Sequence, residues 1–394
     1  DGEEVTTSDI VGTKWLDNHF YGTVFSLNYQ NTNWDVTLGG GWNKYEGDHF
    51  GEVLYTRFAR NNDPYDPYYF NQADKTDFDA IPTINVNALA NPKTFTKTAN
   101  LLVSVSKDIG FFYLINHGID KNICDNAFAA SKSFFALPED QKADIRVNQH
   151  QRGWMPQGMA VLEGAKTSDA KEVFFWGRDV AVDDPDVLKG RALVAPNQWP
   201  KTYAPWLRTQ LMPYYKAVLT LSTLILSGLA EGLGKQPDFF KTVYQNPLGR
   251  GQLVYYPPQT VIDRDEERFG AAPHSDFGVL TILMQDNSGG LQVLNKAGTW
   301  IEAPPLKGSF VCNIGDLLEC WTNGQLVSTK HRVVNRASNA RFSIPIFCDP
   351  ASEAIIDPRD FDENASYETF APCEAGEYIQ TKNTRNFSHY DKAT

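Results

Sequence analysis

The sequence of 394 residues lacks a long uninterrupted run of apolar side chains. Its longest apolar candidate, residues 217–230, is interrupted by Thr220, Ser222, Thr223 and Ser227. A transmembrane helix needs roughly 18 or more consecutive apolar residues. We therefore expect no membrane span.

The sequence also lacks an excess of basic side chains. It has 36 Lys and Arg against 48 Asp and Glu, which gives a formal net charge of −12 at pH 7, and the basic residues do not gather in runs. A protein that binds nucleic acid needs a surplus of Lys and Arg on some face to neutralise phosphates. This balance argues against nucleic acid as a partner and favours small-molecule chemistry.

Cysteine is scarce. The five cysteines are odd in number and show no Cys-x-x-Cys spacing, which argues against both a disulfide framework and a structural zinc site. They are typical of thiols in a reducing compartment. The first residues, Asp-Gly-Glu-Glu, lack the basic and apolar regions of a signal peptide. We expect a cytoplasmic protein, and a monomer.

The residues that are present indicate a globular chain with two unlike parts. Residues 1–77 carry 13 acidic and 5 basic side chains and are rich in aromatics. Within them, residues 20–30 and 34–45 alternate apolar and polar side chains, which is typical of antiparallel strands. We expect a β-rich accessory or fusion segment over residues 1–77, and one interpretation is a β-meander packed on the main domain.

Residues 78–394 predict a mainly β fold with flanking helices. In residues 78–235, apolar spacing predicts helices over 94–107, 120–135 and 203–233, together with strands near 81–86 and 111–117. Residues 236–394 consist mostly of short apolar runs separated by Gly, Pro and Asn turns, which is typical of a barrel or jelly roll. The predicted strands of this second region are 252–256, 279–284, 291–294, 299–303, 309–314, 331–335 and 341–347.

Three residues of the β-rich region could bind a metal ion. His274 and Asp276 are two positions apart, so on a strand their side chains point the same way, and His331 begins another predicted strand. Two histidines and one carboxylate are the ligand set of a non-haem Fe(II) centre, which leaves adjacent positions open for other ligands. A surface pair or a core histidine is the competing interpretation of a His-x-Asp pattern taken alone.

A second pair of side chains follows ten residues after His331. Arg341 and Ser343 are again two positions apart on one predicted strand. An arginine fork beside a hydroxyl is suited to binding a carboxylate. The competing interpretation is an exposed arginine and an ordinary strand serine.

These residues lie in motifs that closely resemble the isopenicillin N synthase-like family of Fe(II)/2-oxoglutarate oxygenases. The motifs are Pro273-His-Ser-Asp-Phe-Gly-Val-Leu-Thr-Ile-Leu, Gly289-Gly-Leu-Gln-Val, Asn313-Ile-Gly-Asp-Leu-Leu, Ser328-Thr-Lys-His-Arg-Val-Val and Arg341-Phe-Ser-Ile-Pro-Ile-Phe. Asp108-Ile-Gly-Phe-Phe-Tyr and Ser133-Phe-Phe-Ala-Leu-Pro are similar to that family's N-terminal region. The resemblance covers residues 79–385 and implies a double-stranded β-helix, the jelly-roll core, with a helical N-terminal region.

The resemblance implies the role of each site residue. His274, Asp276 and His331 would bind Fe(II) and be catalytic, while Arg341 and Ser343 would hold the distal carboxylate of 2-oxoglutarate. Tyr256 matches a tyrosine that assists the cosubstrate, whereas Val254 replaces an asparagine of many plant members. The implied enzyme is a dioxygenase of secondary metabolism that uses O2 to oxidise an unactivated C–H bond of a small molecule. Hydroxylation, desaturation and oxidative cyclisation all remain open as outcomes, with succinate and CO2 as products.

Substrate contacts are expected around the mouth of the barrel. Arginines near the iron would suit a carboxylated substrate, such as an amino acid derivative; core packing and solvated surface charge are the competing interpretations. The candidates are Arg152, Trp154, Phe174, Trp176, Arg178, Arg250 and Phe277.

The first segment carries a resemblance of its own. Residues 15–22 and 39–52 resemble strands of a TonB-dependent outer-membrane receptor barrel. A membrane barrel must close to satisfy its strand edges, and 77 residues are too few for a barrel of that receptor's size. We therefore expect a fusion remnant with no role in the chemistry.

Two alternative functions remain open from the sequence. One is an oxidase like isopenicillin N synthase, which would use the same three ligands without 2-oxoglutarate, so that Arg341 and Ser343 would hold a substrate carboxylate. The other is an inactive fusion product.

Overall fold

The computed structural model describes the backbone of four strands within residues 1–59 and, in full, residues 81–160, 167–258, 268–334 and 339–386. The chain divides into two units, Asp1–Asp77 and Phe78–Thr394. Within the described residues, no helix is long and apolar enough to cross a membrane.

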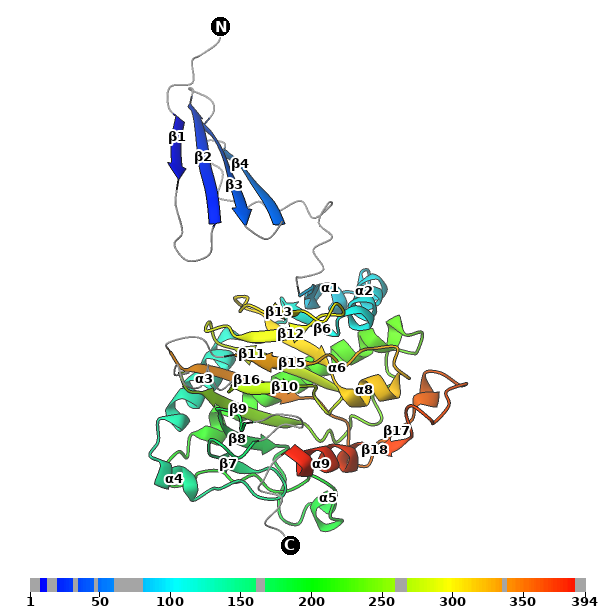
Figure 1. Cartoon of the computed structure of the whole chain (residues 1–394). Helices are drawn as coiled ribbons and strands as arrows, with labels where there is room; N and C mark the ends of the chain where they lie inside the picture. Colours follow the sequence, from blue (N-terminus) through cyan, green and yellow to red (C-terminus); the bar gives the residue numbers. More distant parts are fainter. Residues whose placement is uncertain are drawn as a thin grey trace. The chain divides into compact units, whose positions relative to one another are not determined.

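The first unit holds one antiparallel sheet in which each strand pairs with its neighbour in sequence (Figure 1). The predicted strands over 20–30 and 34–45 are confirmed as β2 and β3, which pair along their full lengths. The strands are β1 (Ser8–Gly12), β2 (Phe20–Gln30), β3 (Asp35–Tyr45) and β4 (His49–Ala59).

Three helices of the second unit are those that the apolar spacing predicts over 94–107, 120–135 and 203–233, and three shorter helices were not predicted. The side chain of Asp120 caps the start of α3 by accepting a hydrogen bond from the Asn122 backbone N–H. α6 packs closely on α2, because a Cβ added at Gly232 would lie 2.6 Å from the Ala99 carbonyl oxygen. The helices in this part are α1 (Val86–Ala90), α2 (Phe95–Asp108), α3 (Lys121–Phe135), α4 (Glu139–Ala143), α5 (Pro185–Leu188) and α6 (Leu207–Gly232).

Two sheets form the core of the second unit. The larger has eight strands in the order β5-β6-β14-β11-β16-β9-β8-β7, and the smaller has four in the order β10-β15-β12-β13. The eight strands are β5 (Thr83–Asn85), β6 (Phe111–Ile115), β7 (Gly153–Met155), β8 (Glu172–Gly177), β9 (Arg250–Tyr256), β11 (Leu280–Gln285), β14 (Phe310–Ile314) and β16 (Arg341–Phe347). The four are β10 (Ala271–His274), β12 (Leu291–Leu294), β13 (Trp300–Glu302) and β15 (His331–Val333). This sheet-rich core with flanking helices confirms the double-stranded β-helix.

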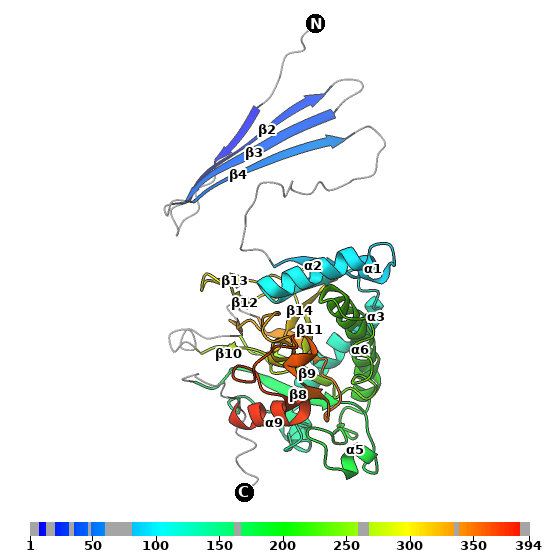
Figure 2. The same cartoon turned by 90° about the vertical axis from the view of Figure 1, so that its right-hand side faces the viewer.

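One face of the eight-stranded sheet packs on helices. The Phe134 ring of α3 lies 4.9 Å from the Phe174 ring of β8, and the Tyr214 hydroxyl of α6 donates a hydrogen bond to the Ile344 carbonyl of β16. Figure 2 shows α3 and α6 along the same side of these strands. Because side chains alternate along a strand, the neighbours of these residues point to the opposite face.

That opposite face is the interior of the barrel. Directly opposed residues of an antiparallel ladder share a face, and the register aligns Ser343 of β16 with Val254 of β9 and Val254 with Val173 of β8. Arg341 is likewise opposite Tyr256. The interior therefore collects the predicted cosubstrate residues on adjacent strands.

Several elements differ from the sequence prediction. β7 and β8 are strands within a stretch for which the periodicity predicted none, and the short helix α8 (Asp316–Trp321) follows β14 directly. The chain then continues through β17 (Ile355–Ile356), β18 (Cys373–Glu374) and α9 (Ala375–Asn386). Residues on both sides of position 235 contribute strands to one sheet. The predicted boundary between residues 78–235 and 236–394 therefore rests on the sequence alone.

Deleting residues 1–77 should leave the second unit folded, because its two sheets and their helices are formed by residues beyond position 80. We expect an unchanged near-ultraviolet circular dichroism signal per tryptophan of the second unit and an unchanged midpoint of its thermal unfolding. A lower midpoint, or loss of the cooperative transition, would show that the first unit is an integral part of the fold.

Candidate metal centre

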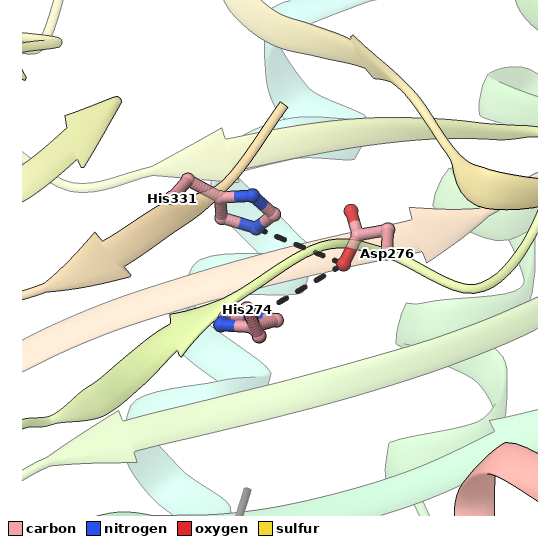
Figure 3. Close-up of side chains that lie close together, drawn as sticks. All are labelled: His274, Asp276 and His331. Atoms are coloured by element: carbon pink, nitrogen blue, oxygen red, sulfur yellow. Dashed lines mark ion pairs between the residues drawn. The ribbon is translucent and has the colours of Figure 1, made fainter. Parts of the chain in front are cut away.

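His274, Asp276 and His331 converge in the barrel (Figure 3). The nearest Asp276 oxygen, Oδ1, lies 3.9 Å from His274 Nε2 and 3.7 Å from His331 Nε2. One potential ligand atom from each residue lies within 4.8 Å of the others, and this is the only such cluster of three or more His, Cys, Asp or Glu side chains in the described part of the chain.

Strand pairing brings the two histidines together. β10 pairs with β15, and His274 is directly opposite His331. The prediction that His274 and Asp276 share one strand is wrong in part, because β10 ends at His274. Asp276 lies in the turn that follows, where its carbonyl accepts a hydrogen bond from the Asp316 backbone N–H.

Hydrogen bonds aim each ligand atom at the centre. Nδ1 of His274 lies 2.7 Å from the Ala272 carbonyl oxygen, and Nδ1 of His331 lies 3.2 Å from that of Thr329. A carbonyl can only accept, so each Nδ1 carries the proton and each Nε2 keeps a free lone pair. These contacts fit a metal ion at the point where both Nε2 atoms face Asp276.

The Asp276 carboxylate is held by its other oxygen. Oδ2 accepts hydrogen bonds from Thr281 Oγ1 at 2.6 Å and from Asn313 Nδ2 at 2.8 Å, which leaves Oδ1 toward the histidines. Sequence reasoning did not select Thr281 or Asn313. Both lie in the motifs quoted above, but only the pairing of β11 with β14 sets them opposite each other.

The electrostatics favour the deprotonated forms of His274 and Asp276. Burial, reinforced by the neighbouring His331, lowers the pKa of His274 to about 4. Burial alone would raise the pKa of Asp276, but His331, His274 and the hydrogen bonds from Thr281 and Asn313 lower it below its ordinary value. Metal ligands must be deprotonated, so the donor set suits a divalent cation at neutral pH.

Arg341 is fully buried and lies on the interior face of β16. Its Nε donates to the Gly289 carbonyl at 2.8 Å and its Nη2 to Gln285 Oε1 at 3.2 Å, while Nη1 has no partner among the described residues. The guanidinium lies 4.8 Å from the Tyr256 ring centroid. A buried cation whose unpaired N–H groups face the interior fits a carboxylate.

The structure does not bring three predicted aromatic contacts to the triad. Phe174 is directly opposite Trp154 and packs on Phe134 and Trp176, on the helix-covered face of the sheet. Trp154 Nε1 donates to Glu172, whose side chain lies on the same face. The prediction missed this because it did not recognise β8, in which even-numbered residues point away from the barrel interior.

The predicted arginines already have partners. Arg152 donates to the carbonyl oxygens of His150, Gln151 and Leu193. Arg178 pairs with Asp186 at 2.6 Å, and Arg250 pairs with the buried Asp349 at 3.0 Å. Of the three, Arg250 lies on the interior face of its strand, opposite Phe347.

Phe277, the last of the predicted substrate contacts, directly follows Asp276 and is half-buried. Its ring lies 5.8 Å from Lys382 Nζ of α9. The phenyl ring therefore lies where the C-terminal helix meets the turn that carries the carboxylate ligand.

Comparisons with known proteins agree with this geometry. Residues 81–202 match a family described as non-haem dioxygenase in morphine synthesis N-terminal, and residues 251–350 match the 2OG-Fe(II) oxygenase superfamily. The 2-oxoglutarate-dependent dioxygenase caaD of Aspergillus niger is 35% identical over 290 residues, covering 71% of this chain and 88% of that relative. Homoarginine-6-hydroxylase 2-ODD-C23.1 of Arabidopsis thaliana is 30% identical over 334 residues, covering 79% of this chain and 99% of that relative.

Solved structures share the fold. T7H of Neurospora crassa in complex with alpha-KG has a TM-score of 0.69 and 25% identity, and the match covers 78% of this chain and 97% of T7H. A putative 2OG-Fe(II) oxygenase family protein from Caulobacter crescentus has a TM-score of 0.68 and 30% identity, with 78% and 99% covered.

Removing either hydrogen bond to Asp276 should weaken metal binding. Thr281→Val and Asn313→Leu would each leave Oδ2 with one donor fewer, and we expect about tenfold weaker Fe(II) affinity in anaerobic calorimetric titrations. Thr98→Val is the matched control, because Thr98 also bonds through its hydroxyl but lies in α2. Unchanged affinity in both test variants would contradict the role assigned to these donors.

Proposed function

The chain belongs to the 2OG-Fe(II) oxygenase superfamily and is a 2-oxoglutarate-dependent dioxygenase, and from this we propose that His274, Asp276 and His331 hold its iron. The observation that carries the proposal is the convergence of three potential ligand atoms on one point, with each side chain held by a hydrogen bond from its far side. Two imidazole nitrogens and one carboxylate oxygen on one side of a metal leave other positions for exchangeable ligands.

We further propose that Arg341 and Ser343 bind the distal carboxylate of 2-oxoglutarate. The unpartnered Nη1 of Arg341 supports this, as does the place of Ser343 two residues further along the same strand face. Tyr256 would bound this pocket, since its ring lies beneath the guanidinium. Val254, opposite Ser343, offers no polar side chain.

The proposed reaction oxidises a C–H bond of a small molecule. Bound Fe(II) would supply the means to activate O2 while 2-oxoglutarate is converted to succinate and CO2, so that one oxygen atom enters succinate and the other is available to the substrate. The residues of the chain would hold and orient the reactants. Phe111 covers His331 with an edge-to-face contact at 5.1 Å between ring centroids.

From the similar solved structures we infer only that the substrate is a small molecule. T7H is also known in complex with thymine, and JOX2 in complex with 2OG, Fe and JA. The argument for a carboxylated substrate weakens, because the arginines that suggested it are partnered by carboxylates or carbonyl groups. Whether substrate is hydroxylated, desaturated or cyclised depends on how it is positioned.

Residues 1–77 take no part in the proposed chemistry, since the candidate residues all lie in the second unit. Their resemblance to an outer-membrane receptor stays a prediction, as do the cytoplasmic location and the monomeric state.

Alanine at position 274, 276 or 331 should abolish turnover while leaving the fold intact, because each substitution removes one of three proposed ligands. Turnover is measured as succinate formed per enzyme, with Fe(II) affinity and circular dichroism followed in parallel. Full activity in any one of the three variants would refute the assignment of that residue.

Arg341→Leu should weaken binding of 2-oxoglutarate about tenfold to a hundredfold, since it removes a charge-assisted fork contributing roughly 1.5–3 kcal/mol. Lysine should restore it only in part, because an ammonium supplies charge without the planar fork. The measurement is the visible charge-transfer band of the anaerobic Fe(II) and 2-oxoglutarate complex. Arg208→Leu is the control, because Arg208 is a largely exposed arginine paired with Asp179.

A wild-type protein that shows no such band, and that consumes O2 with a substrate without forming succinate, would instead be an oxidase like isopenicillin N synthase. Arg341 would then be a substrate-binding residue.

A further inference from the structure

Lys171 lies beside the proposed 2-oxoglutarate pocket. The ladder between β8 and β9 begins with Glu172 opposite Tyr255, so extending the register by one residue places Lys171 opposite Tyr256. Tyr256 is in turn opposite Arg341. Lys171, which directly precedes β8, Tyr256 of β9 and Arg341 of β16 therefore form one row on the same face of the sheet.

This row brings two cations to the same pocket. Adjacent strands are about 4.8 Å apart, so the backbones of Lys171 and Arg341 are separated by roughly 10 Å. The long side chains of lysine and arginine can both reach the space above the tyrosine between them, and the guanidinium already lies over the Tyr256 ring.

Asp169 connects Lys171 to the strand that ends in a proposed iron ligand. Lys171 Nζ lies 2.8 Å from Asp169 Oδ2, and Asp169 Oδ1 accepts a hydrogen bond from the Ala272 backbone N–H at 2.9 Å. Ala272 lies in β10, two residues before His274. The link thus ties the start of β8 to the strand that ends in a proposed iron ligand.

The Lys171 side chain is slightly exposed, whereas the side chain of its acidic partner is buried. The Lys171 side chain is 11% exposed and that of Asp169 only 1%. Burial acts to lower the pKa of Lys171, but Asp169, Tyr256 and Asp276 raise it overall, so the side chain stays charged. An ammonium has three N–H donors, and one bond to Asp169 leaves two for a ligand.

We propose that Lys171 is the second cationic group of the 2-oxoglutarate pocket and donates hydrogen bonds to a carboxylate of the cosubstrate. This inference rests on the proposed function. Val254 supplies no polar side chain to this pocket. Lys171 lies next to Tyr256 on the same face of the sheet, and its ammonium can provide a polar contact instead.

The competing interpretation is that Lys171 only neutralises the buried Asp169. The variant pair Lys171→Met and Asp169→Asn/Lys171→Met separates the two. The double variant removes both charges together, while asparagine keeps an oxygen that can accept from the Ala272 N–H. If Lys171 only neutralises Asp169, the double variant binds 2-oxoglutarate as the wild type does.

Lys142 provides a matched control, because its partner Glu172 lies on the other face of β8. Lys142 is also buried and also pairs with a carboxylate, Glu172, at 2.8 Å, but it contacts the helix-covered side of β8. Lys142→Met therefore removes a comparable buried ion pair without touching the barrel interior. Lys171→Arg keeps the charge at the test position.

The experiment is an anaerobic titration of the full chain with Fe(II) and then with 2-oxoglutarate, followed by the charge-transfer band. We expect about tenfold weaker 2-oxoglutarate binding in both Lys171→Met and the double variant, with Fe(II) affinity unchanged. Lys171→Arg should recover most of the affinity. Lys142→Met should bind 2-oxoglutarate as the wild type does.

Wild-type affinity in the double variant, or in Lys171→Met, would overturn the inference. If the wild type itself binds no 2-oxoglutarate, the proposed function fails, and this outcome is distinct from the others.

Discussion

The antiparallel pairing of β10 with β15 is the constraint on which the metal centre depends. It sets His274 directly opposite His331, although 57 positions separate them in the chain. Each imidazole is then fixed by a backbone carbonyl two residues before it, of Ala272 and of Thr329. The strand pairing therefore positions the ligands, and the local backbone selects the nitrogen that faces the centre.

The larger sheet completes the site from the other side. Thr281 of β11 and Asn313 of β14 are opposite each other and share one oxygen of Asp276. On the next two strands of the sheet, β16 and β9, Arg341 and Tyr256 hold a cation and a ring in contact, and Lys171 continues that row directly before β8. The polar groups face inward, while helices α3 and α6 pack on the apolar outer face.

Buried charges in this barrel are divided into two kinds. Arg250 and Lys171 each have a buried carboxylate within 3.0 Å, whereas Arg341 has only neutral oxygens as partners and one nitrogen with none. An unpaired buried charge is costly, so it is retained where a ligand supplies the missing partner. This difference, rather than the number of arginines, is the reason for proposing Arg341 as the carboxylate-binding residue.

The sequence alone was enough to predict the helices with clear apolar spacing and most strands after position 250, because a period of two or of 3.6 residues is set by neighbours along the chain. The two units were indicated by the change in composition near position 77, and the candidate site residues by motifs that resemble the oxygenase family. Which side chains face the barrel interior depends on the tertiary structure. Phe174 and Val173 are adjacent and both apolar, and no local pattern distinguishes the interior face of β8 from the face that packs on α3. The partners of the arginines and of Lys171 could not be predicted from local sequence either. Asp349 lies 99 positions from Arg250, and the backbone donor of Ala272 lies 103 positions from Asp169.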